Sequence, residues 1–272
     1  MKKIQIKNKA KTLKKQEYNK YKNDINKHCV EFYNLLDSTP KIKVIIKDDL
    51  NSAGSVYRKN SNTYILLLNK KTVLSHNIVL ECVLFHEYAH IYDMEHAHKQ
   101  IQSDVQVSNY CNDLEQYICT IGFDSWTEFF AYSKSMKAFN TKTNTFLELV
   151  KVYKNLIKTY KKIENEKQLV EFKNQLDLFV YSSSMYLANY QATGKRRKYC
   201  EKTKNSKEFK QLHSIYGNFY NKLGVIFHGV SGKRYKKRIF NLGDFIIRAF
   251  YVPFDIYPKK TKKGYILSYQ PS

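Results

Sequence analysis

Few cysteines, few acidic residues and no long apolar run set the first limits on this 272-residue chain. The five cysteines form an odd set without CxxC spacing: Cys29, Cys82, Cys111, Cys119 and Cys200. This pattern predicts neither a disulfide framework nor a cysteine-based zinc site. We therefore expect reduced thiols in a cytoplasmic protein.

The apolar runs are short, since the longest are ILLL at residues 65–68 and VLF at residues 83–85. A membrane-spanning helix needs about 20 apolar residues. The basic N-terminus, MKKIQIKNKAKTLKKQ, is not followed by the apolar segment of a secretory signal. We therefore expect no membrane partner.

Acidic residues are scarce beside basic ones: 24 against 47, which gives a formal net charge of +23. Such an excess attracts nucleic acids and other polyanions through counterion release and long-range steering. Alternatively, the charge reflects only the lysine- and asparagine-rich composition that an AT-rich genome encodes. Lysines are scattered along most of the chain, so the sequence leaves both explanations open.

The N-terminal part has the patterns of helix and small sheet. Residues 12–36 place apolar side chains at three- and four-residue spacing, which predicts an amphipathic helix. Residues 41–47 alternate apolar and polar side chains, and residues 63–69 form a β-rich run, so both are expected strands, with 55–58 as a possible strand between them. Ser75 could cap a helix that runs to about Met94.

The rest of the chain is mainly helical in pattern. Four segments have the apolar period of a helix: 114–120, 127–139, 142–192 and 208–223. Two basic segments, 194–207 and 224–238, are expected loops, and the aromatic segments 246–258 and 264–269 are expected strands. These patterns predict a mainly helical α+β fold without internal repeats or flexible linkers.

The motif HEYAH, residues 86–90, lies inside the predicted helix that follows the sheet. Residues four apart share a helix face, so His86 and His90 can offer imidazole nitrogens to one ion. Glu87 is displaced around the helix, where its carboxylate can act on a water at that ion. The pattern predicts one zinc ion per chain, with Glu87 as general base and acid. The alternative is a helix with two incidental histidines.

A catalytic zinc usually has three protein ligands, and Glu128 is the leading candidate for the third. It lies in the apolar segment DSWTEFFAY, and the small Ala131 nearby would allow close packing against the motif helix. In a competing interpretation, Ser125 and Glu128 form a capping box, and Glu128 bonds back to the helix start. If Asp124 is the cap instead, Glu128 is free to point at a metal.

The rival third ligand is His96, which completes the histidine spacing of the extended HExxHxxGxxH pattern. In that pattern a glycine at the seventh position turns the chain sharply, and here that position is Asp93. His98 is a more distant candidate. Asp93, three residues after His90, could orient that histidine.

In two segments, HEYAH and WTEFFA, the chain resembles the gluzincins. These are zinc metallopeptidases that take a third ligand from a glutamate on a second helix. The resemblance spans residues 40–140. It implies that His86, His90 and Glu128 bind zinc and that Glu87 is the catalytic residue of an endopeptidase. It also implies an edge strand that pairs with a protein or peptide substrate, which we expect to be residues 63–69 (TYILLLN), with substrate contacts at Tyr64, Ile65, Leu66 and Leu67.

The resemblance implies a zincin-like organisation. Residues 1–140 would form the catalytic region: an N-terminal helix, a small sheet packed on the HExxH helix, and the helix with Glu128. Residues 141–272 would form a helical, basic region packed on the first as one unit. A finer similarity to the ImmA/IrrE group, which acts on DNA-bound repressors, would suit the basic charge.

In many gluzincins a later histidine or tyrosine stabilises the oxyanion. Four residues of this chain are candidates, and their spacing selects none of them: Tyr186, Tyr190, His213 and His228.

A second hypothesis makes the chain a nucleic-acid-binding protein in which HEYAH is incidental or vestigial. Its evidence is two basic loops, 194–207 and 232–238, where lysines and arginines could contact phosphates and tyrosines could stack on bases. No zinc finger or other nucleic-acid-binding fingerprint accompanies these loops.

Overall fold

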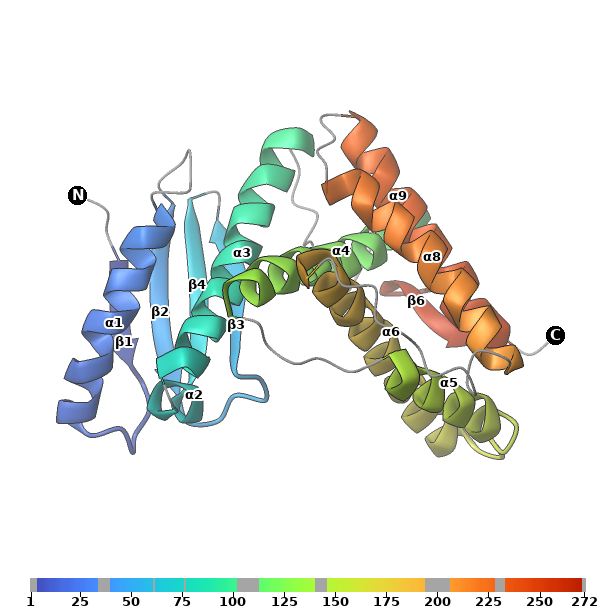
Figure 1. The fold of residues 1–272 in the computed structure, drawn as a ribbon, viewed down its shortest axis with the longest axis horizontal. Helices are drawn as coiled ribbons and strands as arrows, with labels where there is room; N and C mark the ends of the chain where they lie inside the picture. Colours follow the sequence, from blue (N-terminus) through green and yellow to red (C-terminus); the bar gives the residue numbers. More distant parts are fainter. Residues whose placement is uncertain are drawn as a thin grey trace. The chain divides into compact units, whose positions relative to one another are not determined.

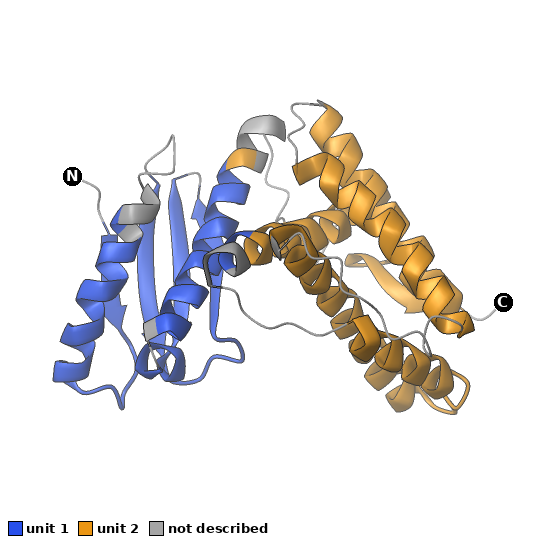
Figure 2. Ribbon diagram, viewed as in Figure 1, with its two compact units in different colours: residues 1–95, 134–140 blue, residues 96–133, 141–272 orange. Residues whose placement is uncertain are grey.

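The computed structural model describes residues 4–33, 40–60, 62–75, 77–101, 113–139, 146–193, 206–227 and 233–270. The chain divides into two compact units (Figure 2). Unit 1 contains residues 1–95 and 134–140, and unit 2 contains residues 96–133 and 141–272. The expected boundary at residue 140 between a catalytic and a C-terminal region stays a prediction.

Unit 1 is built on a four-stranded mixed sheet in the order β1-β2-β4-β3 (Figure 1). Its strands are β1 (Ile4–Asn8), β2 (Lys41–Lys47), β3 (Gly54–Asn60) and β4 (Thr63–Asn69). β2 runs parallel to β1 and β4, whereas β3 is antiparallel to β4. The predicted strands at 41–47 and 63–69 are confirmed. β1 was not predicted. Two alternating isoleucines are too short a pattern to indicate a strand, and the segment forms one only by pairing with β2.

Two helices of unit 1 lie side by side on one face of this sheet. α1 (Lys15–Tyr33) contacts β1 through the Tyr18 hydroxyl, which donates to the Ile6 carbonyl at 3.0 Å. α3 (Asn77–Ile101) contacts β4 through the Tyr64 hydroxyl, which donates to Glu95 Oε1 at 2.6 Å. His28 and Glu81 join α1 to α3, with Nε2 and Oε1 3.0 Å apart. These contacts fix α3 against the sheet.

The expectation that residues 63–69 form an edge strand is wrong. β4 pairs with β2 on one side and with β3 on the other. Its neighbours also cover its faces, since Tyr64, Ile65 and Leu66 are buried and Leu67 is half-buried. These four residues therefore belong to the core of unit 1, and β3 is the edge strand beside β4.

The ends of the motif helix also differ from the prediction. Ser75 does not cap α3: it ends the short helix α2 (Lys70–Leu74), where its backbone N–H donates to the Thr72 carbonyl. α3 then runs without a break past Met94 to Ile101. The motif consequently lies in the middle of a long helix rather than near its end.

Unit 2 is mainly helical. Its helices are α4 (Leu114–Phe139, whose last residues belong to unit 1), α5 (Phe146–Tyr160), α6 (Glu166–Thr193), α8 (Lys207–Phe227) and α9 (Lys233–Ile246). A π-helical turn η1 (Ile247–Tyr251) and a 3-10 turn η2 (Val252–Phe254) lead into a hairpin of β5 (Ile256–Thr261) and β6 (Gly264–Tyr269). The strand expected from residue 246 is helical to residue 254, because the apolar side of α9 continues through η1 into the core.

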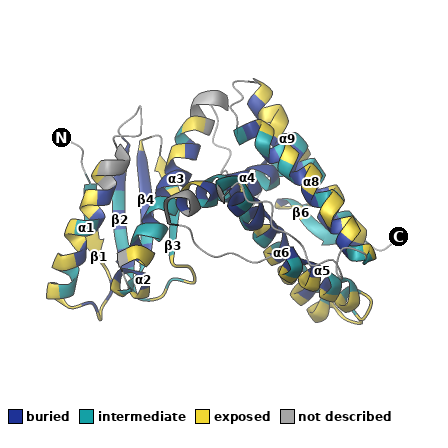
Figure 3. Ribbon diagram, viewed as in Figure 1, coloured by how far each residue is buried: buried dark blue, intermediate teal, exposed yellow. Residues whose placement is uncertain are grey.

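Aromatic side chains fill the core of unit 2. Phe146, Phe209 and Tyr216 meet across α5 and α8, with Phe146 5.1 Å from Phe209 and 5.4 Å from Tyr216 between ring centroids. α8 buries one side and exposes the other, as Figure 3 shows. The mainly helical α+β class is therefore confirmed, and its helices follow the predicted apolar period.

The helix that carries Glu128 does not begin at residue 125, as the capping interpretations required. α4 starts at Leu114, and the Asp113 side chain accepts from the Glu115 N–H at 2.7 Å. The segment GFDSW, expected to separate two helices, is helical throughout. Gly122 lies there because α9 packs too closely for a side chain: a Cβ would overlap the Ile239 carbonyl.

Among the residues that the structure describes, no helix combines the length and the apolarity that a membrane crossing requires.

The crossing of α4 and α9 predicts which glycines matter for stability. Gly122→Ala and Gly243→Ala should each lower the free energy of unfolding by about 1–3 kcal/mol, since the added methyl group would meet a backbone carbonyl of the other helix. Gly217→Ala and Gly224→Ala on α8 are matched controls, because nothing lies within 4 Å of the added Cβ. They should stabilise by up to about 1 kcal/mol. Urea denaturation measures both, and equal effects of the two pairs would contradict this packing.

Candidate metal centre

Two histidines of α3 point their ring nitrogens at one place. The Nε2 atoms of His86 and His90 are 3.0 Å apart, and the ring centroids are 4.6 Å apart at 89°. The cause is the four-residue spacing, which places both side chains on one face of the helix one turn apart. His90 is buried and His86 is half-buried. The pair is therefore largely shielded from solvent, while His86 stays partly accessible to it.

The sheet orients this helix through an apolar stripe. Leu80, Leu84, Tyr88 and Ile91 are all buried and recur at helical spacing. At 100° per residue, the two histidines lie well around the helix from this stripe. Anchoring of the stripe on the sheet therefore fixes the direction in which the histidines project.

Glu87 lies between the apolar stripe and the histidine face, and only 5% of its surface is exposed. Its carboxylate lies against the start of the edge strand β3: a Cβ added to Gly54 would be 3.1 Å from Glu87 Oε1. Val83, one turn earlier on α3, occupies the same space, since its Cγ1 would be 2.7 Å from the added Cβ. Glycine at position 54 thus allows the edge strand to approach the carboxylate.

Asp93 is more deeply buried still, at 2% exposure, one turn after His90. A buried aspartate on that face can orient a neighbouring imidazole. The predicted role of Asp93 toward His90 is compatible with this position and stays a prediction.

Glu128 lies in the middle of α4, so its carboxylate is not used in a capping box. Ligand atoms of His86, His90 and Glu128 all lie within 4.8 Å of one another and could hold a metal ion. This is the group that the sequence predicted.

The donor set suits zinc. Two nitrogens bound tetrahedrally at about 2.0–2.1 Å from zinc lie roughly 3.3 Å apart, close to the 3.0 Å between the two Nε2 atoms. Two imidazoles and one carboxylate are also a common ligand set of catalytic zinc sites. The residues therefore fit the predicted ion.

Sequence reasoning placed Tyr132 on the helix face of Glu128 but missed Tyr181. The hydroxyl of Tyr181, on α6, hydrogen-bonds both the Glu128 carboxylate and the Tyr132 hydroxyl, which is 3.2 Å away. Tyr181 is partly exposed, but desolvation by the surrounding protein, followed by the charge of Glu128, raises the pKa of its hydroxyl above the ordinary value. The hydroxyl is therefore a neutral donor. No signal in the sequence links Tyr181 to Glu128, because the two residues meet only when α6 packs beside α4.

Asp124 lies one turn before Glu128 on the same face of α4. Its side chain reaches solvent, but desolvation by the surrounding protein, followed by the like charge of Glu128, raises the pKa of Asp124 to about 6. The face of α4 that presents Glu128 therefore carries two carboxylates and Tyr132 at successive turns.

The rival ligand His96 is not part of the group. α3 continues through Asp93 without the sharp turn that the extended histidine pattern requires. A straight helix carries a residue ten positions later roughly 15 Å along its axis. His96 is exposed, and its ring contacts Tyr235 at 6.0 Å between centroids. His98 lies in the same unbroken helix.

The four candidates for oxyanion stabilisation have other surroundings or lie outside the described residues. Tyr186 is buried against Phe146 and Tyr216. Tyr190 packs edge-on against Tyr220, and the exposed His213 stacks on Phe209. His228 is outside the described part of the chain. Nothing in these contacts assigns any of them to the metal group.

The predicted basic loops are only partly described. Residues 194–205 lie outside the described residues. The segment 233–238 is not a loop but the first part of α9, in which Arg234, Lys236, Lys237 and Arg238 are exposed.

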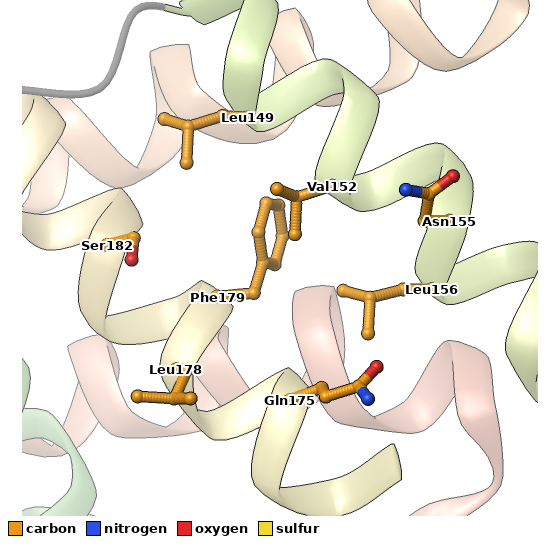
Figure 4. Close-up of a pocket in the computed structure, with 8 residues that line it drawn as sticks. All are labelled: Leu149, Val152, Asn155, Leu156, Gln175, Leu178, Phe179 and Ser182. Carbon is orange, nitrogen blue, oxygen red and sulfur yellow. The ribbon is translucent and has the colours of Figure 1, made fainter.

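A cavity of about 350 Å³ lies between α5 and α6 (Figure 4). Its lining is mostly apolar, with Leu149, Val152 and Phe179 among the residues that face it, and its polar groups are neutral. It contains no acid, base or metal ligand, so it has no means of catalysis of its own.

Comparison with family models, with curated proteins and with solved structures found no match to this chain. A function is therefore inferred from the residues of this chain and from their arrangement.

Metal binding provides the first test of the group. The wild-type chain, purified without a histidine tag, should bind about one zinc ion, and His86→Ala or His90→Ala should abolish this binding. Glu128→Ala should lower zinc affinity by more than the roughly 10- to 100-fold that loss of a residue behind a ligand costs. His96→Ala is the matched control and should bind zinc like the wild type. Titration against a chelating dye measures all four, and equal losses for Glu128→Ala and His96→Ala would contradict the assignment.

Tyr181 has a separate test. Tyr181→Phe removes the hydroxyl that hydrogen-bonds Glu128, so cobalt affinity, followed by visible absorption, should fall roughly tenfold. Tyr190→Phe, on the same helix but in contact with Tyr220, should leave the affinity unchanged. Wild-type cobalt affinity in Tyr181→Phe would show that the hydroxyl does not orient the carboxylate.

Proposed function

We propose that this chain is a zinc-dependent metallopeptidase of the gluzincin type. The observation that supports it most is the approach of His86, His90 and Glu128 ligand atoms to within 4.8 Å, with the buried Glu87 beside the first histidine. These residues have the identities and the helical spacing that the HExxH chemistry requires. A zincin-like architecture, with a small sheet behind the motif helix, forms part of the proposal.

In this proposal some residues would bind the metal ion, and another would transfer protons. His86, His90 and Glu128 would hold the ion, and Asp93 would orient His90. A zinc ion bound there would supply a Lewis acid that acidifies water and polarises a carbonyl group. Glu87 would take the proton of the attacking water and deliver it to the leaving nitrogen of the peptide bond. Burial of Glu87 keeps bulk water from competing for that proton.

The edge strand β3 is the proposed substrate-binding strand, in place of β4. In the sheet order of the described residues β3 stands at one end, beside β4, so an extended peptide could add as a further strand there. Gly54, at its start, lies against the Glu87 carboxylate. A peptide paired with β3 would thus pass close to the proton-transferring residue, so the protein or peptide substrate is proposed to bind as an added strand.

We further propose that the chain is similar to the ImmA/IrrE group, whose members act on repressors bound to DNA. Its support is the net charge of +23, which would keep the enzyme near nucleic acid. The proposed location of such an enzyme is the cytoplasm, in agreement with five cysteines that lack disulfide spacing.

The decisive variant is Glu87→Gln, which keeps the size of the side chain but cannot accept the proton. It should bind zinc with wild-type stoichiometry and lose at least about 100-fold in hydrolysis of a casein or mixed peptide substrate. Glu171→Gln, at an exposed position of α6, controls for loss of a carboxylate and should cleave at the wild-type rate. Mass spectrometry of the products measures cleavage.

Two results would reject the proposed activity. One is a wild-type chain that retains no zinc; the other is cleavage by Glu87→Gln at the wild-type rate.

A further inference from the structure

Unit 2 has a basic surface made by two segments that are distant in sequence. The first is the start of α9 and the second is the tip of the β5–β6 hairpin (Figure 1). We call their eight exposed basic residues the basic surface: Arg234, Lys236, Lys237, Arg238, Lys259, Lys260, Lys262 and Lys263.

The hairpin tip holds its lysines in fixed positions. Thr261 pairs with Gly264, so Lys262 and Lys263 form a two-residue loop. The Thr261 hydroxyl donates to the Gly264 carbonyl at 2.7 Å and accepts from the Lys263 N–H at 3.2 Å. Gly264 has φ 118°, a conformation that glycine adopts without strain, as at the bulge after a hairpin turn. The loop is therefore tightly closed.

The first turns of α4 link the two segments. Lys260 lies directly opposite Tyr265 and so shares its face of the hairpin. Tyr265 stacks on Tyr117 of α4, with 6.3 Å between ring centroids. Two residues earlier, Glu115 pairs with Lys236 of α9 at 2.9 Å. The basic segments thus flank the N-terminal end of α4 within one compact unit.

Most of this charge is not neutralised by neighbouring acids. Of the eight basic residues, only Lys236 forms an ion pair with a residue that the structure describes. Asp113 and Glu115 are the acidic residues at this end of α4, and Glu115 is the partner of Lys236. The basic surface therefore retains a strong positive excess that favours a polyanion.

The shape of the hairpin selects among polyanions. Successive residues of a strand point to opposite faces, so Lys259 and Lys260 carry charge on both faces of the hairpin. A flat anionic membrane would meet only one of these faces. The major groove of duplex DNA, about 12 Å wide, admits a two-stranded ribbon and has phosphates along both walls.

We propose that the basic surface binds duplex DNA, with the hairpin tip in the major groove and the start of α9 on the adjacent phosphates. The contacts are to the backbone, so binding depends on salt and not on sequence. This site lies outside the proposed metal centre, and it does not depend on zinc or on hydrolysis.

The test is fluorescence anisotropy of a labelled 20-base-pair duplex with the full chain, from 50 to 200 mM salt. Wild-type binding should weaken steeply as salt increases, because each neutralised phosphate adds about 0.9 to the slope of log affinity against log salt. Lys262→Ala/Lys263→Ala should lower affinity roughly tenfold and reduce the slope by about 2. Lys262→Arg/Lys263→Arg should restore both.

Lys15→Ala/Lys27→Ala is the matched control, since it removes the same charge from exposed positions of α1 in unit 1. It should bind with nearly wild-type affinity and slope. An equal loss in this control would show that only net charge matters and would overturn the proposal. Stronger binding to a single-stranded 20-mer or to anionic phosphatidylserine vesicles, or no binding to the duplex at 50 mM salt, would also overturn it.

Discussion

One helical turn holds the imidazole nitrogens of His86 and His90 3.0 Å apart, and the proposed chemistry depends on that separation. Two imidazole nitrogens that point at one place are suited to binding one cation between them. The rest of unit 1 keeps this arrangement in place. Its sheet anchors the apolar stripe of α3, and the Tyr64–Glu95 hydrogen bond fixes the later part of the same helix.

The sequence predicted the features that depend on local periodicity. The strand at 41–47, the strand at 63–69 and the motif helix follow from side-chain alternation and from apolar spacing. The approach of Glu128 to the two histidines also followed, from chemical identity and from its apolar surroundings. These residues have the properties that a metal site needs, irrespective of how distant elements pack.

What the sequence did not predict depends on long-range pairing. A β-rich run has the same composition at an edge as in the centre of a sheet, so the central place of β4 could not be read from residues 63–69. Likewise, Gly122 resembles a helix breaker until α9 is known to cross there. The contact of Tyr181 with Glu128 joins residues more than 50 positions apart, and neither belongs to a motif that requires the other.

Helix α4 carries residues of both proposed sites. Its first turns carry Glu115 and Tyr117 beside the basic surface, and Glu128 lies roughly 16 Å further along the same helix. An enzyme with this layout could bind DNA and act on a protein close to it. Each function nonetheless has its own residues, so either can be lost without the other.

X-ray absorption spectroscopy of the chain loaded with one equivalent of zinc identifies the ligands of the ion. We expect nitrogen and oxygen ligands at about 2.0–2.1 Å, with the scattering of two imidazole rings and no sulfur. Because the chain has five cysteines, a cysteine site is a real alternative. Sulfur at about 2.3 Å, or fewer than two imidazoles, would contradict a zinc site at His86, His90 and Glu128.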